Sequence, residues 1–264
     1  MSIINTIISG GGQQPSGTIT ITSNTTTNVA QYEYAVTAVP TTAPALYREF
    51  QLDGTGKLIP NTTTTHIMDF TGMTDISDNA LYRAYSGNTA ISGAVDMSDL
   101  TKVSGNTACQ YMFYGCTGLI SFDLSALTTI SGSNACAYMF QNCTGLTSAN
   151  LPALTTVNGV SPCGNMFNGC TGLISADLPA LTTLTGYGAC QSMFYGCTSL
   201  KTVYIGGTTV INFGTSTNQF TSMFQGCTQN IDVYAPAANQ AQIEAFSGYP
   251  NFGATRTVTW HWRS

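Results

Sequence analysis

Charged side chains are scarce in this sequence, making up only 7% of its 264 residues. Seven Lys or Arg stand against twelve Asp or Glu, which gives a formal net charge of −5 at pH 7. Affinity for nucleic acid depends on clustered Lys and Arg that neutralise phosphates, so the composition argues against a nucleic-acid-binding protein. Thr, Ser, Asn, Gly and Gln supply the polar character instead, and such compositions are common on extracellular and virion fibres.

Long apolar segments are also absent. No stretch approaches the ~18 consecutive apolar residues of a membrane-spanning helix, so we expect no insertion into a membrane. The opening MSIINTIISGGGQQPSG lacks the basic start and long apolar core of a secretory signal peptide. We expect an extracellular protein, on a virion or a bacterial surface. Its leader is then either missing from this chain, or the protein leaves the cell by another route such as lysis.

Internal repetition is the dominant feature that the sequence does have. One pattern occurs five times at a spacing of 27 residues, as DFTGMTDIS from Asp69, DMSDLTKVS from Asp96, DLSALTTIS from Asp123, NLPALTTVN from Asn150 and DLPALTTLT from Asp177. A Met-Phe pair recurs at the same interval from Met112 to Met193, and again at Met223 after a three-residue insertion. A fixed period of this kind indicates a solenoid in which each repeat forms one coil.

Each repeat divides into two halves. The first half, starting at Leu119, reads LISFDLSAL and matches the strand pattern L-x-x-L-x-L-x-x-L. Alternation along this strand directs Phe122 and Leu124 inward and Asp123 outward. The second half, NTACQYMFYGC, spaces its two Cys, its Met and its Phe at i, i+3, i+4 and i+7, which predicts a helix of about two turns. Stacked coils would place the strands in one parallel sheet, ~4.8 Å apart, with the short helices opposite.

The segment MFYGCTGLISFDLSALTTI resembles the BspA-type leucine-rich repeats, whose units carry M-F-x-x-C-x-x-L before a leucine strand. The resemblance extends over roughly residues 67–236, and this chain differs in its second cysteine and its longer unit. It implies a leucine-rich-repeat solenoid that is right-handed and curved, with a parallel β-sheet on one face and short helices on the other. Members of that family are mostly surface or secreted interaction proteins, so the resemblance implies binding rather than catalysis.

Four parts follow along the chain: an arm at 1–16, a β-hairpin segment at 17–65, the repeats at 66–235 and a cap at 236–264. GTITITSNTTTNVAQYEYAVTAVP predicts a hairpin and resembles a hairpin segment of phage and prophage tail and baseplate proteins, with Thr25 in place of Gly. LYREFQLDGTGKLIP predicts a second hairpin that turns at DGTG. Together the hairpins would close the N-terminal edge of the solenoid.

The C-terminal part lacks the repeat pattern. NIDVYAP predicts a last repeat strand, a short helix follows from about Ala237 to Phe246, and RTVTWHW predicts an ending strand. Trp260 and Trp262 would share one face of that strand, with His261 opposite. If buried, the two tryptophans cap the last coil; if exposed, they form a secondary binding patch.

The nine cysteines form two columns with the period of the repeat: Cys109, Cys136, Cys163 and Cys190, then Cys116, Cys143, Cys170, Cys197 and Cys227. We interpret them as buried packing thiols. Disulfides between coils and a metal site are the alternatives. A zinc site needs four ligands that converge on one point, which columns do not provide, and an odd number excludes complete pairing. We therefore expect no metal.

Histidine is rare, and neither His66 nor His261 accompanies the repeated cysteines. A cysteine nucleophile needs such a base, so we expect no catalytic residues and no cofactor. A glycan-active enzyme, the alternative of another class, would need a differentiated pair of carboxylates in a cleft. The regular aspartate column does not provide one. We therefore predict a non-enzymatic protein.

The outward face of the strands is the predicted ligand-binding face. Its residues are Asp69, Asp96, Ser121, Asp123, Ser148, Asn150, Ser175, Asp177, Thr202 and Tyr204. Carboxylates, hydroxyls and an aromatic ring suit a glycan or protein on a cell surface, and they suit a merely solvated strand face equally well. We favour adhesion by a phage or prophage tail-associated protein. The alternative is a bacterial BspA-like adhesin that binds host proteins, and a homo-oligomer is left open.

Overall fold

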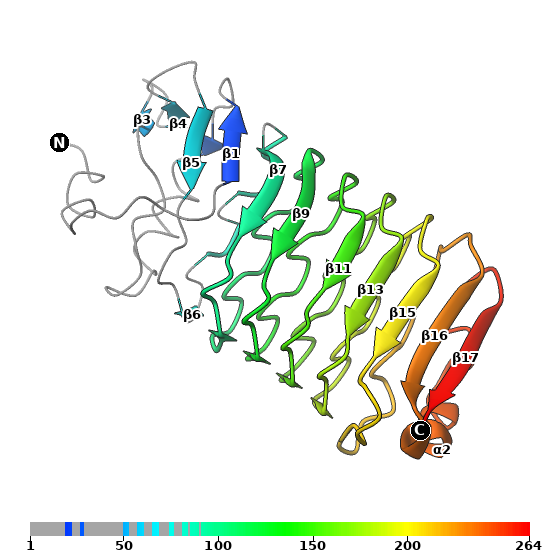
Figure 1. The fold of residues 1–264 in the computed structure, drawn as a ribbon. Helices are drawn as coiled ribbons and strands as arrows, with labels where there is room; N and C mark the ends of the chain where they lie inside the picture. The colour runs from blue at the N-terminus through cyan, green and yellow to red at the C-terminus, as the bar shows by residue number, and fades with distance from the viewer. Residues whose placement is uncertain are drawn as a thin grey trace.

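The structure, a computed structural model, describes the strands within 19–68 and residues 74–76, 81–83, 85–89 and 91–264. Asp69 lies outside the described residues. The described residues from 74 onward form a solenoid whose coils lie one behind another (Figure 1). The expected solenoid with parallel strands is confirmed.

One face of the solenoid carries the predicted parallel strands, which lie side by side (Figure 1). They are β7 (Ile91–Asp96), β9 (Leu119–Asp123), β11 (Ser148–Asn150), β13 (Ser175–Leu178), β15 (Thr202–Ile205), β16 (Ile231–Pro236) and β17 (Val258–Arg263). β7 pairs with β9, and β11 to β17 form one continuous five-stranded sheet. Between these two groups the ladder is interrupted, where Phe122 occupies the position of Ala149 and Ala176 in the next coils. We attribute the interruption to this larger ring, which packs inward against Phe140.

A second parallel sheet follows the first in every coil and was not anticipated. It contains β6 (Asp75–Ile76), β8 (Lys102–Val103), β10 (Thr129–Ser131), β12 (Thr156–Asn158) and β14 (Thr183–Leu184). These strands lie at the end of the repeated pattern, as Thr129–Ser131 does in DLSALTTIS. Ile130 and Val157 point into the core and lie in register, while the threonines beside them face outward. Every one of these strands contains at least one β-branched residue, which favours the extended backbone.

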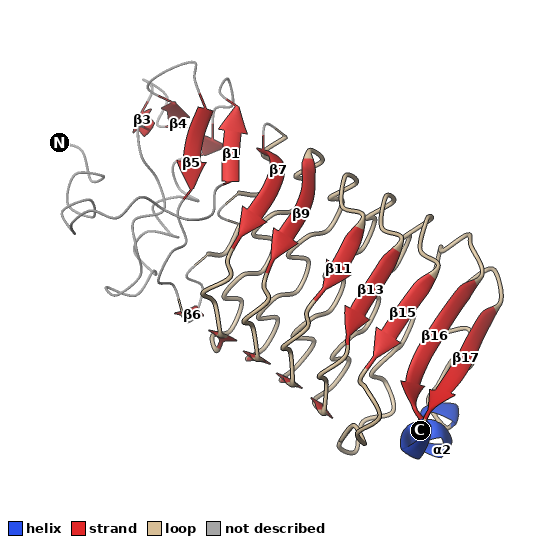
Figure 2. Cartoon of the chain, in the orientation of Figure 1, coloured by secondary structure: helices blue, strands red, loops and turns tan. Residues whose placement is uncertain are grey.

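The predicted short helix opposite the sheet is wrong. Residues 106–115 form a series of turns, and the helices among the described residues are confined to the C-terminal end (Figure 2). Alternate amides bond along the chain, as Met112 N to Cys109 O, and to the next coil, as Phe113 N to Met139 O at 2.8 Å. A helix would use all of these amides internally. Bonding between coils therefore replaces the helix, while Cys109, Met112, Phe113 and Cys116 still point inward as predicted.

The core consists of side-chain columns that run along the solenoid axis. The rings of Phe113, Phe140, Phe167 and Phe194 are all fully buried and stack at centroid distances of 5.5 to 5.9 Å. Tyr85 extends the column at one end and Phe224 at the other. Buried leucines complete each coil, as at Leu119, Leu146, Leu173 and Leu200. No coil buries these side chains alone, so the stack is the folding unit.

At the N-terminal edge, one of the two predicted hairpins is confirmed. β3 (Phe50–Leu52) pairs antiparallel with β4 (Lys57–Pro60), as expected on either side of DGTG. The first hairpin is wrong: β1 (Ile19–Thr22) pairs with β5 (Thr65–Met68) and with β7, while β2 (Thr27–Asn28) pairs with β4. β1 thus covers the edge of the first repeat strand. A free strand edge exposes unpaired backbone groups. Pairing of β1 with the edge of β7 satisfies these groups, and it replaces the local hairpin that we expected.

At the C-terminal edge, the expected elements are present. After β16 come η2 (Ala237–Asn239), α2 (Gln240–Glu244) and then β17, which pairs in parallel with β16. Asn239 is buried and bonds both backbone groups of Ile211, with Nδ2 donating to O at 2.8 Å and Oδ1 accepting from N at 2.7 Å. This pair of bonds attaches the cap to the preceding coil.

Candidate binding face

Six of the ten predicted face residues form two columns on the outer side of the five-stranded sheet. In the first column Ser148, Ser175 and Thr202 are in register, and Asp232 and Thr259 continue it. In the second column Asn150, Asp177 and Tyr204 are in register, and Tyr234 and His261 continue it. Asp96 and Asp123 face each other in the separate β7–β9 pair, and Ser121 lies beside Ala94 there. The sequence therefore identified the columns, and the structure extends both into the cap.

The aspartates of the column are not equivalent. Asp96 Oδ1 accepts a hydrogen bond from Ser98 N at 2.9 Å, and Asp123 Oδ1 accepts one from Ser125 N at 2.8 Å. Both carboxylates therefore stabilise the turn after their strand. The residue two positions after Asp177 is Pro179, which has no N–H to donate. Asp177 consequently cannot form this bond.

Three aromatic rings stand in the second column beside Asp177. Tyr204 and Tyr234 stack with centroids 4.6 Å apart, and Tyr234 and His261 stack at the same distance. Both faces of the Tyr234 ring are therefore covered by neighbours. The ladder presents ring edges and hydroxyl groups to solvent, so its middle ring offers hydrogen bonds rather than a stacking surface.

Charged groups surround this ladder. Arg263 places its guanidinium 5.7 Å from the centroid of the Tyr204 ring, and its Nη1 donates to Gly206 O at 3.4 Å. Partial burial raises the pKa of Asp177, and the nearby Arg263 opposes that rise. Asp232 Oδ1 lies 2.8 Å from His261 Nε2. One cation, two carboxylates and an imidazole are thus held around two phenol hydroxyls.

Sequence reasoning missed Asp232, Tyr234, His261 and Arg263. Their signal was the period of two in the last two strands: counting outward positions from Tyr204 across β16 and β17 would have found them. Trp260 and Trp262 point the other way and pack partly buried against the core, with ring centroids 5.6 Å apart. Trp260 Nε1 donates to Pro250 O at 3.0 Å. Their packing is that of a cap over the last coil.

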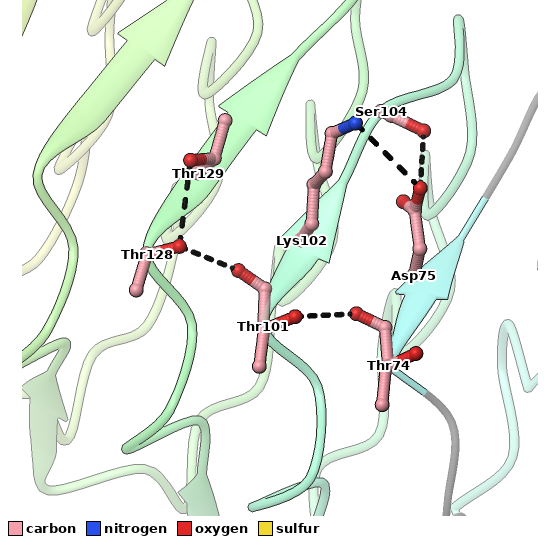
Figure 3. A network of polar contacts seen from close by, with 7 residues as sticks. All are labelled: Thr74, Asp75, Thr101, Lys102, Ser104, Thr128 and Thr129. Carbon is pink, nitrogen blue, oxygen red and sulfur yellow. Dashed lines mark hydrogen bonds and ion pairs between the residues drawn. The ribbon is translucent and has the colours of Figure 1, made fainter.

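The second sheet also carries an ordered polar surface (Figure 3). Thr101 Oγ1 donates to Thr74 O and Thr128 Oγ1 donates to Thr101 O, each at 2.9 Å. Lys102 Nζ and Ser104 Oγ both approach Asp75 Oδ2, at 3.8 and 2.9 Å (Figure 3). The threonine side chains satisfy carbonyl groups of the preceding coil. This surface is accounted for by stacking of the coils.

All nine cysteines are free and buried, as the packing interpretation predicted. The thiols of the second cysteine column donate hydrogen bonds to the previous coil. Cys143 Sγ donates to Phe113 O and Cys170 Sγ donates to Phe140 O, both at 3.0 Å. Burial raises the pKa of Cys116, Cys170 and Cys190 to about 12. In the part of the chain that the structure describes, no His, Cys, Asp and Glu side chains gather as metal ligands would. The thiols therefore fill space and bond carbonyl groups.

The fold and its repeated turn-strand unit define a leucine-rich-repeat solenoid. The chain matches the family described as BspA type leucine rich repeat region, in six copies over residues 63–171 and 106–230. This chain is therefore a member of the BspA-type leucine-rich-repeat family, whose proteins are generally non-catalytic and typically associated with cell surfaces.

Among solved structures, the chain is similar to a leucine-rich repeat protein from Bacteroides ovatus ATCC 8483. The two share 14% identity over 81% of this chain and 68% of the other, with a TM-score of 0.25. No curated protein matches the sequence. Within the described residues, every helix is too short or too polar to cross a bilayer.

Proposed function

We propose that this protein is a non-catalytic adhesin that binds a cell-surface molecule through the outer face of β13 to β17. The observation that carries the proposal is the Tyr204–Tyr234–His261 ladder, flanked by Asp177 and Arg263. The Asp177 carboxylate does not bond the turn that follows its strand, and the Arg263 guanidinium lies beside the Tyr204 ring. Both groups can bind another molecule directly. Tyr and Arg are also enriched among the residues that dominate binding energy at protein interfaces.

The partner we propose is a glycan or protein of a cell surface, and the mixed charges favour a protein. Opposite charges held close together pair with complementary charges on a partner and fix its orientation. A neutral sugar would offer no opposite charge to Arg263 or Asp177. Self-association would multiply the number of faces per particle, and light scattering on the purified chain measures it.

The biological setting is proposed on narrower grounds. A phage or prophage tail-associated protein is supported by the segment GTITITSNTTTNVAQYEYAV alone, whereas a bacterial surface adhesin is supported by the family. The neighbouring genes discriminate between the two. Tail and lysis genes would support the first setting, and secretion or sorting genes the second.

Binding of the labelled full chain to a panel of intact bacterial and animal cells tests the proposed function. Asp177→Asn and Tyr234→Ala should each weaken binding by roughly tenfold, since loss of one good contact costs ~1.4 kcal/mol. Asp123→Asn is the matched control, because the amide oxygen of Asn can still accept from Ser125 N. Protease treatment of the cells should abolish binding to a protein partner.

Two results would contradict the proposal. Equal loss of binding in Asp123→Asn and Asp177→Asn would show that the ladder has no special role. Turnover of a glycan that disappears in Asp123→Asn would show that the protein is an enzyme. Circular dichroism of each variant separates loss of binding from loss of the fold.

A further inference from the structure

Besides the two columns of the strand face, another outward column lies on the turn side of the solenoid. It contains one residue from each successive coil: Arg83, Tyr111, Tyr138, Asn165, Ser192 and Ser222. All six have a positive φ, between 53° and 59°. The first five donate their backbone N–H groups to carbonyl groups of the next coil, as Tyr138 N does to Gly164 O at 3.0 Å. The column is therefore a repeated structural position with variable side chains.

Tyrosine is a costly residue at this position. A left-handed backbone costs roughly 1–2 kcal/mol for most side chains and is tolerated best by Gly, Asn and Asp. Asn165 shows that the coil accepts the easier residue, yet Tyr111 and Tyr138 occupy the two coils before it. Strain of this kind persists where a side chain has a role beyond the backbone. The two tyrosines thus invite a functional explanation.

The large side chains of the column form a stack that ends abruptly. The Arg83 guanidinium lies 4.8 Å from the centroid of the Tyr111 ring, and Tyr111 and Tyr138 stack at 4.6 Å with nearly parallel planes. Next in the column is Asn165, whose Oδ1 accepts from Asn168 Nδ2 at 2.9 Å. The second face of Tyr138 therefore adjoins an amide pair instead of another ring. The change in side-chain size creates a step, one ring wide, in this surface.

The groups around the step are uncharged. Asn165 and Asn168 are followed by Ser192 in the next coil, and by Tyr195, whose side chain is 39% exposed. The face of an aromatic ring carries partial negative charge and attracts the C–H groups on the flat face of a sugar ring. Amide and hydroxyl groups beside it both donate and accept, as sugar hydroxyls require. A protein interface needs ~800 Å² per partner, far more than one ring-sized step.

We propose that the step formed by Tyr138, Asn165, Asn168 and Ser192 is a binding site for one neutral sugar ring. The sugar stacks on the part of the Tyr138 ring that projects beyond the shorter Asn165 side chain, and it continues the Arg83–Tyr111–Tyr138 column. The amides of Asn165 and Asn168 and the Ser192 hydroxyl bond the sugar hydroxyls. This site is separate from the strand face, so either site can exist without the other.

The test is saturation-transfer NMR on the full chain with methyl β-glucoside, methyl β-galactoside and N-acetylglucosamine as probes. Asn165→Tyr would extend the ring stack and cover the projecting part of the Tyr138 ring. We expect it to weaken binding of the probe sugar by at least about tenfold. The fold should survive, because Tyr already occupies this position in two coils. Ser222→Tyr is the matched control, since it introduces the same residue in the same column two coils away from Asn165, and it should leave binding unchanged.

Tyr138→Ser provides a second variant, since Ser occupies the position in two coils, and it too should abolish binding. Tyr234→Ala on the strand face should leave sugar binding unchanged, whatever it does to cell binding. The proposal is overturned if none of the three probes binds at concentrations of tens of millimolar. It is also overturned if Asn165→Tyr binds as tightly as Ser222→Tyr.

Discussion

Alkaline pH should unfold this protein sharply, because its thiols must stay protonated in the folded state. Burial is the main cause that raises the pKa of most of the cysteines, to about 12 for Cys116 and Cys170 and about 11 for Cys227. An unfolded thiol ionises near pH ~8.5. Above that pH the unfolded chain loses protons that the folded chain keeps, so the free energy of unfolding falls as pH rises.

The magnitude follows from the number of thiols. Each one contributes a slope of ~1.4 kcal/mol per pH unit between its unfolded and folded pKa. The pKa is raised for Cys116, Cys136, Cys143, Cys163, Cys170, Cys190, Cys197 and Cys227. Eight such groups together remove ~11 kcal/mol by about pH 9.5, which is comparable to the whole stability of a typical protein. The expected midpoint lies between about pH 9 and pH 10.

The assay follows circular dichroism and thiolate absorbance together from about pH 7 to pH 11, with reductant present. Both signals should change in one cooperative step. Replacing one buried thiol, as in Cys190→Ala, should reduce the steepness of the pH dependence by about one eighth. Thiolate absorbance that rises while the circular dichroism stays native would refute the reasoning, as would a chain that remains folded at about pH 11.

Three further predictions concern the core and the backbone. All nine thiols should resist alkylation at neutral pH and react together once guanidinium unfolds the chain; rapid reaction of the native protein would contradict their burial. Phe140→Ala should lower the free energy of unfolding by ~3–5 kcal/mol in denaturant titrations, whereas the exposed Ile120→Ala should change it little. Gly132→Ala should lower the melting temperature, since its φ is +107° and a Cβ would lie 2.6 Å from Gly105 O; a melting temperature equal to that of the parent would show that the backbone relaxes.

The sequence predicted the solenoid and its inward columns because the repeat places chemically equivalent residues at equivalent positions. Phe140 and Cys143 are buried as the period required, whatever the backbone between them does. The helix was wrongly predicted because turns and a helix both bring residues at i, i+3, i+4 and i+7 to one side. Backbone bonding between coils decides between them, and side-chain periodicity contains no information about it.

The candidate face was predicted in part for a similar reason. Asp96, Asp123 and Asp177 look alike in the repeat, and only the residue two positions later, Ser or Pro, distinguishes a turn-forming carboxylate from one without that bond. That difference was readable from the sequence. The position of Arg263 beside Tyr204 could not be read from the sequence. Arg263 lies 57 residues from Gly206, whose carbonyl group it bonds, and the fold of the cap decides whether the two meet.

The bonds between turns give the molecule a direction. In each coil the alternate amides donate to carbonyl groups of the coil that follows in the chain, as Phe194 N does to Met223 O and Phe224 N to Phe252 O. Among these turns, loss of coils from the C-terminal end would strand N–H donors, whereas loss from the N-terminal end would strand carbonyl acceptors, which proteins tolerate more readily. The second sheet has the opposite direction, since Thr128 N donates to Thr101 O of the preceding coil. During synthesis each coil must wait for its successor to emerge before its turns are satisfied. The cap supplies the acceptor for the last repeat, since Phe252 O accepts from Phe224 N.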